Sequence, residues 1–441
     1  MRKIAFVGAG SLGFTRKLFS DLMSVKEFRT GTEVAFMDIN PHNLEMVTTL
    51  CQRDLDANNI PIKIVSTTEL GVALKDAKYV FNCIRVGGLE AFETDIEIPL
   101  RYGVDQCVGD TICAGGIMYG QRVIAAMKDI CDSIKANARP DVLMLNYSNP
   151  NAMVTWACNH YFGVNTIGLC HGVIHGHQQI ADAFGVKYED LDVVCTGINH
   201  QTWYLSVKHK GEDLTPRILE AFEKDEHLSA TEKLRIDVMK RFGYYSTESN
   251  GHLSEYLMWY RKRAGEMEKW NDPEGWYGGE TGGYLRVCRE GRNWFETEYP
   301  KWLGEPPNNY DDMERGVEHG SYIVEALELG RVYRGHFNVI NNGTITNLPD
   351  DCIIETPCYV DGNGLSVPKV GDLPMGCGAI CSQSVWVQRL AVEAAVKGDV
   401  TLLKQAMMMD PLTGAVCTVD EIDAMVADFL REQAQWLPQY S

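Results

Sequence analysis

The stretch "KIAFVGAGSLGF", residues 3–14, decides the fold of this sequence. A short apolar run, typical of a buried strand, leads into a glycine-rich turn that opens a segment with helical spacing of apolar residues. Gly8, Gly10 and Gly13 fit the pattern G-x-G-x-x-G, in which a dinucleotide pyrophosphate lies against the turn and the helix N-terminus. The third glycine of the pattern lets the helix pack close to the strand. The position between a predicted strand and a predicted helix is the context that such a site requires.

An acidic residue follows where a ribose-binding carboxylate is expected. The next predicted strand, "EVAFMDIN", has Asp38 at its end, 25 residues after Gly13. An acidic residue at this point binds the ribose hydroxyls and favours NAD over NADP. The alternative is an ordinary surface aspartate in a turn. Because strand, turn, helix and acid agree, we predict an NAD site that includes Gly8, Gly10, Ser11, Gly13 and Asp38.

Four further apolar runs predict a parallel sheet. They are "KIVST", "YVFNCIRVGG", "VLMLNYSNP" and "TIGLCHG", and each ends in glycine, asparagine or another polar residue. We therefore predict an α/β protein with an N-terminal Rossmann-type parallel sheet whose strand C-termini carry the site. Asn82, Arg85 and Gly87 are expected beside the nicotinamide half of the cofactor. Asn149 precedes a proline at a strand end, where it is either a site residue or a turn residue.

The length of the chain, 441 residues, is enough for two domains. We predict an NAD-binding Rossmann-like domain over residues 1–195. Helical and strand-like segments mix in the second half, which predicts an α+β domain for substrate binding and oligomerisation over residues 196–441. Within it, the charged and glycine-rich stretch 271–294 predicts a long loop.

The bulk composition excludes several classes of function. A net charge of −19 argues against a nucleic-acid surface, which needs a basic patch. The sequence contains no run of 18 apolar residues, so we predict no membrane span. The first residues lack the apolar region and cleavage site of a signal peptide, so we expect a cytoplasmic protein. The 14 cysteines are scattered without a disulfide spacing and are expected to be reduced.

One short stretch gathers potential metal ligands. "TIGLCHGVIHGHQQ", residues 166–179, contains Cys170, His171, His175 and His177. His175 and His177 are two positions apart and do not share a helical face. The paired ligand spacing of a closed structural zinc site is absent. We therefore do not expect a structural zinc here.

A catalytic ion is a separate hypothesis. Cys170 lies at the tip of one predicted strand, and His200 ends another in "GINHQTWYL". A thiolate and an imidazole could hold one metal and leave positions open for substrate oxygens. The alternative is a buried cysteine and a hydrogen-bonded core histidine, and the spacing alone does not bring the two residues together.

The motifs as a set resemble those of glycoside hydrolase family 4. The matching stretches are "KIAFVGAGSLGF", "FMDIN", "RVGG", "CVGDTICAGGI", "NYSNPNAM", "GLCHG", "GINHQTWY", "NGTITNLPDDCIIETPCYVD" and "VGDLP". They follow the order of the family over nearly the whole chain. The resemblance implies NAD-dependent oxidation of the sugar at C3, removal of the C2 proton, elimination of the aglycone, and then water addition and re-reduction. It also implies a homodimer or homotetramer.

The resemblance assigns roles to individual residues. Cys170 and His200 fall on the family ligands for Mn²⁺ or another divalent metal. Asn149 in "SNP" falls on the residue that touches substrate hydroxyls. Asp110 in "GDT" falls on the lining of the sugar pocket, and we predict it to be one of the catalytic residues. His171 follows the metal cysteine, where the 6-phospho branch carries an aspartate as general acid; we expect His171 to be the acid here.

The resemblance places the catalytic base in the second half. "TESNGHLSEYLMWY" is the best local match, with Glu248, His252, Glu255 and Tyr256 as candidates. We predict Tyr256 as the base and Glu248 and His252 as substrate-binding residues. A tyrosine has an ordinary pKa of about 10, so a nearby positive charge would have to lower it. The alternative is a buried helical tyrosine.

The substrate branch follows from two of these motifs. "CVGDTICAGGI" and "YYSTESNGHLSEY" resemble the α-galactosidase branch most. Arg85 in "IRVGG" argues the other way, because such an arginine holds a 6-phosphate in the phospho branch. It could also bind a uronate, the cofactor or a structural partner. We rank α-galactosidase first, α-galacturonidase second and 6-phospho-glycosidase third.

Two other classes compete with a glycosidase. One is a plain NAD-dependent dehydrogenase, and the other is an NAD-binding sensor without catalytic activity. The pair of Cys170 and His200 argues against both, because neither needs a metal site.

Overall fold

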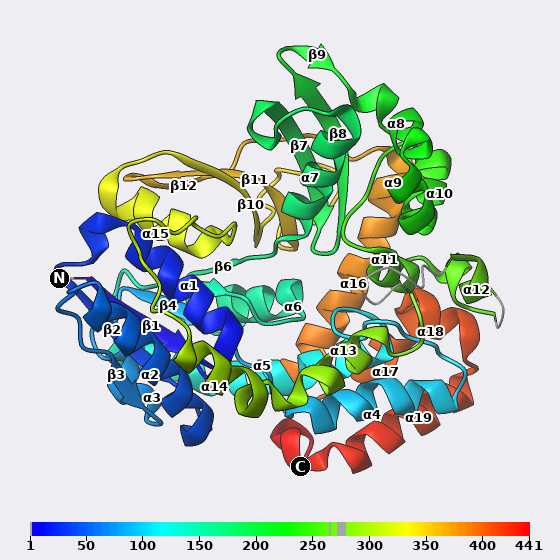
Figure 1. Ribbon diagram of the computed structural model, residues 1–441. Coiled ribbons are helices and arrows are strands. Elements are labelled where there is room, and N and C mark those ends of the chain that lie inside the picture. The colour runs from blue at the N-terminus through cyan, green and yellow to red at the C-terminus, as the bar shows by residue number, and fades with distance from the viewer. Residues whose placement is uncertain (1, 264–265, 271–278) are drawn as a thin grey trace.

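A single twelve-stranded sheet organises the molecule (Figure 1). The computed structural model describes residues 2–263, 266–270 and 279–441. Its first six strands are parallel and lie in the order β3-β2-β1-β4-β5-β6, which is the Rossmann order. They are β1 (Arg2–Val7), β2 (Thr32–Met37), β3 (Val65–Thr67), β4 (Tyr79–Asn82), β5 (Leu143–Asn146) and β6 (Thr166–Gly168).

The sheet does not end at β6 but continues with antiparallel strands. Asn338 of β10 pairs with Gly168 of β6, and the order runs on through β10-β11-β7-β8-β9, with β12 on β11. These strands are β7 (Leu191–Ile198), β8 (Gln201–His209), β9 (Glu212–Asp213), β10 (Tyr333–Ile340), β11 (Ile353–Asp361) and β12 (Gly364–Ser366). The predicted α/β class with a Rossmann-type sheet is confirmed. The domain boundary after residue 195 stays a prediction, and β7 runs across it.

Helices connect and cover these strands. In the first half they are α1 (Leu12–Ser24), α2 (Pro41–Ala57), α3 (Leu70–Leu74), α4 (Gly88–Arg101), α5 (Cys113–Asn137), α6 (Asn151–Trp156) and α7 (Gly172–Phe184). In the second half they are α8 (Ile218–Lys224), α9 (Glu226–Thr231), α10 (Lys233–Phe242), α11 (Asn250–Tyr256), α12 (Glu266–Trp270), α13 (Gly283–Glu290), α14 (Trp294–Gly304), α15 (His319–Leu329), α16 (Met375–Lys397), α17 (Val400–Met409), α18 (Pro411–Val416) and α19 (Val419–Glu432). None of the described helices is long and apolar enough to cross a membrane.

The parallel strands are held by apolar side chains on both faces. Phe6 of β1 stacks on Phe81 of β4, with ring centroids 4.7 Å apart, and meets the edge of Phe36 of β2 at 5.2 Å. All three rings are almost fully buried. Burying such rings is worth several kcal/mol in total, and this explains why continuous apolar runs form this half of the sheet.

One expectation about the second half is wrong. The stretch 271–294 was expected to be a loop, but residues 283–290 form α13. Leu285 of α13 packs with Phe92 and Ile96 of α4, so tertiary packing outweighs the glycine-rich composition. Residues 271–278 of this stretch lie outside the described residues.

A buried ion pair joins α4 to α5, and the C-terminal end of the chain binds to it through Gln433. Arg122 donates to both carboxylate oxygens of Asp95, at 2.8 and 2.6 Å, and to Gln433 at 2.7 Å. The side chains of Arg122 and Asp95 are each 1% exposed.

Replacing Arg122 therefore tests how this docking stabilises the fold. Arg122→Met leaves the Asp95 charge buried without its partner, which should lower the free energy of unfolding by about 3–5 kcal/mol. Arg101→Met removes a solvent-exposed pair with Glu432 and should cost less than about 1 kcal/mol. Urea unfolding of both variants measures the difference, and equal losses would contradict this view of the ion pair.

Candidate active site and metal centre

The glycine-rich turn after β1 presents backbone groups and an open helix end. Gly8 has φ +82°, and a Cβ there would lie 2.8 Å from the backbone of Cys83. The amide of Gly10 donates to Asp38 Oδ2 at 2.7 Å. Ser11 is the exposed N-cap of α1, and among the described residues no side chain caps this helix end and no acidic residue lies in its first turn. The amides at this end suit an anionic group such as a pyrophosphate.

Two details of this turn were not expected. A Cβ at Gly13 would meet only Trp302 of α14, at 3.9 Å, so this glycine does not provide the close approach of helix to strand. Ile39, directly after Asp38, is 87% exposed. An apolar side chain beside the carboxylate that is predicted to bind ribose offers a surface for a flat base, and the isoleucine in "MDIN" is visible in the sequence.

The three residues expected near the nicotinamide lie in different surroundings. Asn82 is fully buried, and its amide donates to Asn146 and Ser148. Gly87 is the N-cap of α4 with φ +86°. Arg85 is surrounded by aromatic rings, whose centroids lie 4.4 Å (Phe92), 5.4 Å (Tyr119) and 5.6 Å (Tyr284) from its guanidinium carbon.

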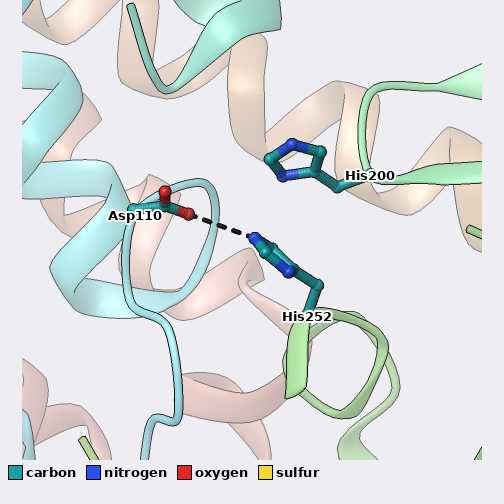
Figure 2. Close-up of side chains that lie close together, drawn as sticks. All are labelled: Asp110, His200 and His252. Atoms are coloured by element: carbon teal, nitrogen blue, oxygen red, sulfur yellow. Dashed lines mark ion pairs between the residues drawn. The ribbon is translucent and has the colours of Figure 1, made fainter. Parts of the chain in front are cut away.

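The other predicted site residues converge where the two halves of the sheet meet. Asp110 lies in the loop before α5, and Cys170 lies between β6 and α7. His200 lies in the two-residue turn between β7 and β8 with φ +62°, while Glu248 and His252 lie just before and within α11. Figure 2 shows Asp110, His200 and His252 with their side chains turned toward one another.

The tautomer of His200 follows from its neighbours. Thr111 Oγ1 lies 2.8 Å from His200 Nδ1 and donates to Asp110 Oδ1 at 2.7 Å. A hydroxyl has one proton, so Thr111 accepts from Nδ1–H, and His200 Nε2 carries a lone pair. Burial lowers the pKa of His200 to about 4, so the ring is neutral. A neutral imidazole with a fixed free nitrogen is the form that binds metals.

That free nitrogen faces a set of metal-ligand atoms. Cys170 Sγ, a His200 nitrogen and a Glu248 carboxylate oxygen all lie within 4.8 Å of one another. The amide of Gly172, at the start of α7, donates to Cys170 Sγ at 3.4 Å. Burial raises the pKa of the Cys170 thiol well above its ordinary value, with Glu248 and Glu355 adding to the effect, so a bound cation would be needed to ionise it. The donor set of thiolate, imidazole and carboxylate fits a divalent ion.

A second set of potential ligands consists of Asp110, His200 and His252, whose ligand atoms also lie within 4.8 Å of one another. Its oxygens are already used: Asp110 Oδ1 accepts from Thr111, and Oδ2 accepts from Asn149 Nδ2 at 2.9 Å. A third set joins Glu248 to His171 and the exposed His175. The set of Cys170, His200 and Glu248 therefore fits a metal ion best, because its ligand atoms are available and its residues are largely buried.

Glu248, His252 and Asp110 form a chain of opposite charges. His252 Nε2 lies 3.4 Å from Asp110 Oδ1, and Nδ1 lies 3.5 Å from Glu248 Oε2. Burial alone would lower the pKa of His252, but Glu248 and Asp110 raise it to about 9. Burial would raise the pKa of Glu248, but the neighbouring histidines, among them the protonated His252, lower it below its ordinary value. At neutral pH the chain is a protonated imidazole between two carboxylates.

The predicted acid and base have contrasting positions. His171 is half-exposed, with Nδ1 3.7 Å from Glu318 Oε1 and Nε2 3.9 Å from Glu248 Oε1. Tyr256 is buried, and its hydroxyl donates to the carbonyl of Asn199 at 2.9 Å. Burial raises the pKa of Tyr256 well above its ordinary value, which is the direction opposite to the one that a base needs. Its role as the base stays a prediction.

Sequence reasoning did not identify two residues of this site. Thr111, which fixes the His200 ring, directly follows Asp110 in "GDT", so the motif contained it. Glu318 precedes α15 and meets His171 from a distant part of the chain; no spacing in the sequence signals this contact. His177, in contrast, stacks on Tyr188 at 3.8 Å, outside the metal-ligand sets.

Comparison with known proteins gives a consistent result. The family 4 glycosyl hydrolase model matches residues 3–186, and the family 4 glycosyl hydrolase C-terminal domain matches residues 195–413. The chain is 54% identical to an α-galactosidase of Rhizobium meliloti (strain 1021), over 100% of this chain and 90% of that protein. It is 34% identical to an α-galactosidase of Bacillus subtilis (strain 168), over 100% of both. The Thermotoga maritima 6-phospho-β-glucosidase, solved with manganese, NAD⁺ and glucose 6-phosphate, shares the fold with a TM-score of 0.79 at 24% identity, over 98% of this chain and 99% of that one.

Removing the Thr111 hydroxyl tests the orientation of His200. Thr111→Val takes away the acceptor for Nδ1–H, and affinity for divalent metal should fall by roughly 10–100-fold. Titration of the metal-free protein with Mn²⁺ measures this. Thr15→Val is the matched control, because Thr15 is equally buried and its hydroxyl has no hydrogen-bond partner among the described residues. A Thr111 variant that binds Mn²⁺ as tightly as the Thr15 variant would contradict the assignment.

The raised pKa of His252 predicts a pH dependence of stability in the metal-free protein. The folded pKa is about 9 and the ordinary value is 6.5, so the folded state binds more protons over this range. The stabilisation is fully present below the ordinary pKa and is lost as the pH rises through the folded pKa, by up to about 3 kcal/mol. Urea unfolding across this window should show a steeper decline for the wild type than for His252→Gln. Parallel pH profiles would show that His252 is not protonated in the fold.

Proposed function

The chain belongs to glycosyl hydrolase family 4, and we propose that it hydrolyses α-galactosides with NAD and a divalent metal ion, such as Mn²⁺, as cofactors. The observation that carries the proposal is the cluster of Cys170, His200 and Glu248, at the end of β6 in the same sheet as a dinucleotide-type glycine turn. A plain dehydrogenase has no need of such a cluster. The 54% identity to an α-galactosidase over the whole chain supports the choice of sugar.

The residues around the glycine turn fit NAD. The amides at the N-terminus of α1 receive the pyrophosphate, and Asp38 receives the ribose hydroxyls. In the structure Asp38 accepts from the Gly10 amide, so its carboxylate already faces the turn. Ile39 offers its exposed side chain to the adenine.

The residues of the cluster fit a divalent metal and a sugar. Cys170 and His200 would hold the ion, and Thr111 keeps the His200 lone pair toward it. Asn149, fixed by its hydrogen bond to Asp110, presents its amide to sugar hydroxyls. When bound, NAD supplies a reversible hydride acceptor and the metal supplies Lewis-acid polarisation of sugar oxygens.

Three titratable side chains of the site donate, hold or accept the protons of the proposed reaction. His171 is half-exposed next to the cluster, where it can deliver a proton to the departing aglycone. His252 holds its proton at Nε2 toward Asp110 and keeps the Asp110 carboxylate ionised and oriented. We keep Tyr256 as the proposed base, with its hydroxyl directed to the turn that carries His200.

Release of p-nitrophenol from p-nitrophenyl α-galactoside tests the proposal. NAD⁺, Mn²⁺ and reductant are omitted in turn, and we expect cleavage only when NAD⁺ and Mn²⁺ are both present. NADH should not accumulate, because the hydride returns to the sugar in each turnover. If the protein cleaves only an α-galacturonide or a 6-phospho-glycoside, the proposed reaction stands but the proposed substrate is wrong. Arg85 would then have an anion-binding role. Steady NADH accumulation without release of aglycone would overturn the proposed function.

A further inference from the structure

The contact between Glu248 and His200 is unusual for a carboxylate and an imidazole. Glu248 Oε2 lies 3.2 Å from His200 Nε2. The Thr111 hydroxyl places the His200 proton on Nδ1, so Nε2 faces Glu248 with a lone pair. Two acceptor atoms therefore lie within hydrogen-bond distance with no proton between them.

Apart from the ion pair with His252, the Glu248 oxygen has no partner among the described residues that accounts for its position. Oε2 is buried and accepts no hydrogen bond among the described residues. His252 Nδ1 is the other imidazole atom near it, at 3.5 Å, and this nitrogen also contacts the Ser249 hydroxyl at 2.9 Å. His252 offsets the charge of this carboxylate, but its Nδ1 is too far away for a hydrogen bond to Oε2. A cation between Glu248 and His200 would satisfy Oε2 and remove the repulsion between the two acceptor atoms.

We propose that Glu248 is a third protein ligand of the metal ion, which is then held through Cys170 Sγ, His200 Nε2 and Glu248 Oε2. The inference rests on the proposed function and adds a ligand to the pair that the sequence motifs indicate. His200 Nε2 and Glu248 Oε2 are 3.2 Å apart, and Cys170 Sγ lies within 4.8 Å of a nitrogen of His200 and a carboxylate oxygen of Glu248. Donors bound about 2.0–2.3 Å from one ion are separated by roughly 3–4 Å, so only small movements close the site.

The start of α7 is shaped to receive this carboxylate. A Cβ on Gly172 would lie 2.8 Å from Glu248 Cγ and 3.3 Å from the carboxyl carbon. A side chain at position 172 would therefore clash with Glu248 in its present position, and one of the two would have to move. The same glycine donates its amide to Cys170 Sγ, so it serves two of the three ligands at once.

The charges also balance. The Cys170 thiolate and the Glu248 carboxylate together carry two negative charges, which offset a divalent cation in a buried site. His200 would be the neutral ligand beside these two, and a divalent ion such as Mn²⁺ held there would polarise sugar oxygens.

Mn²⁺ binding without NAD or sugar tests the inference separately from catalysis. Metal-free protein is titrated with Mn²⁺, and the free ion is followed by electron paramagnetic resonance. Glu248→Gln should bind at least ~100-fold more weakly than the wild type. The matched control is Glu318→Gln, because Glu318 is another buried glutamate near His171 but belongs to none of the metal-ligand sets. It should bind within about threefold of the wild type, since it removes no ligand.

Gly172→Ala gives a second test that keeps all three ligand residues. Its Cβ displaces the Glu248 side chain, and we expect roughly tenfold weaker Mn²⁺ binding. This variant decides the question if Glu248→Gln does not fold. With Co²⁺ as the probe, Glu248→Gln should retain the thiolate charge-transfer band, which reports that Cys170 still binds.

The outcomes separate the inference from the proposed function. If the wild type binds Mn²⁺ and both the Glu248 and Gly172 variants bind it equally well, the third ligand is wrong while the proposed function stands. In that case Glu248 acts on the substrate instead. If the wild type itself binds no Mn²⁺ at millimolar concentration, the metal assignment in the proposed function fails.

Discussion

The junction between the parallel and antiparallel halves of the sheet is the constraint on which the site depends. Asn338 pairs with Gly168 at the end of β6, and Glu355 of β11 pairs with Gly197 at the end of β7. These two short pairings place the β7–β8 turn, with His200, beside Cys170, which lies two residues after the end of β6. Neither half could build the metal-ligand cluster alone, because each supplies only part of it.

Electrostatics at this junction follows from burial combined with pairing. A lone imidazole or carboxylate at such depth would be driven to its neutral form. Glu248 and Asp110 instead remain ionised because His252 lies between them as a cation. His200, in contrast, is kept neutral, because its one ring proton is on Nδ1, where Thr111 accepts the hydrogen bond, and burial opposes a second proton. The site thus holds a cationic and a neutral histidine whose ring centroids are 4.3 Å apart.

The sequence predicts those parts of the molecule that depend on local pattern. The glycine turn, Asp38, the Rossmann order and the position of Cys170 at a strand end follow from apolar runs and their terminating residues. The helix α13 could not be predicted, because Leu285 is held by packing on α4 rather than by local propensity. The meeting of Cys170 with His200 also depends on strand pairing between distant segments. Likewise, the aromatic surroundings of Arg85 come from three separate segments of the chain.

The docking of the last residues onto α4 and α5 has a consequence for the order in which the protein is made. Gln433 binds Asp95, Trp436 lies against Gly87, and the Tyr440 hydroxyl donates to Gln121 at 2.7 Å. During synthesis on the ribosome, the N-terminal half with the strands β1 to β6 is made first. The contacts of Gln433, Trp436 and Tyr440 form only after these residues have emerged. Strands β10 and β11, which complete the sheet, also come late. Until β10 has been made, the edge of β6 in the N-terminal half is therefore unpaired.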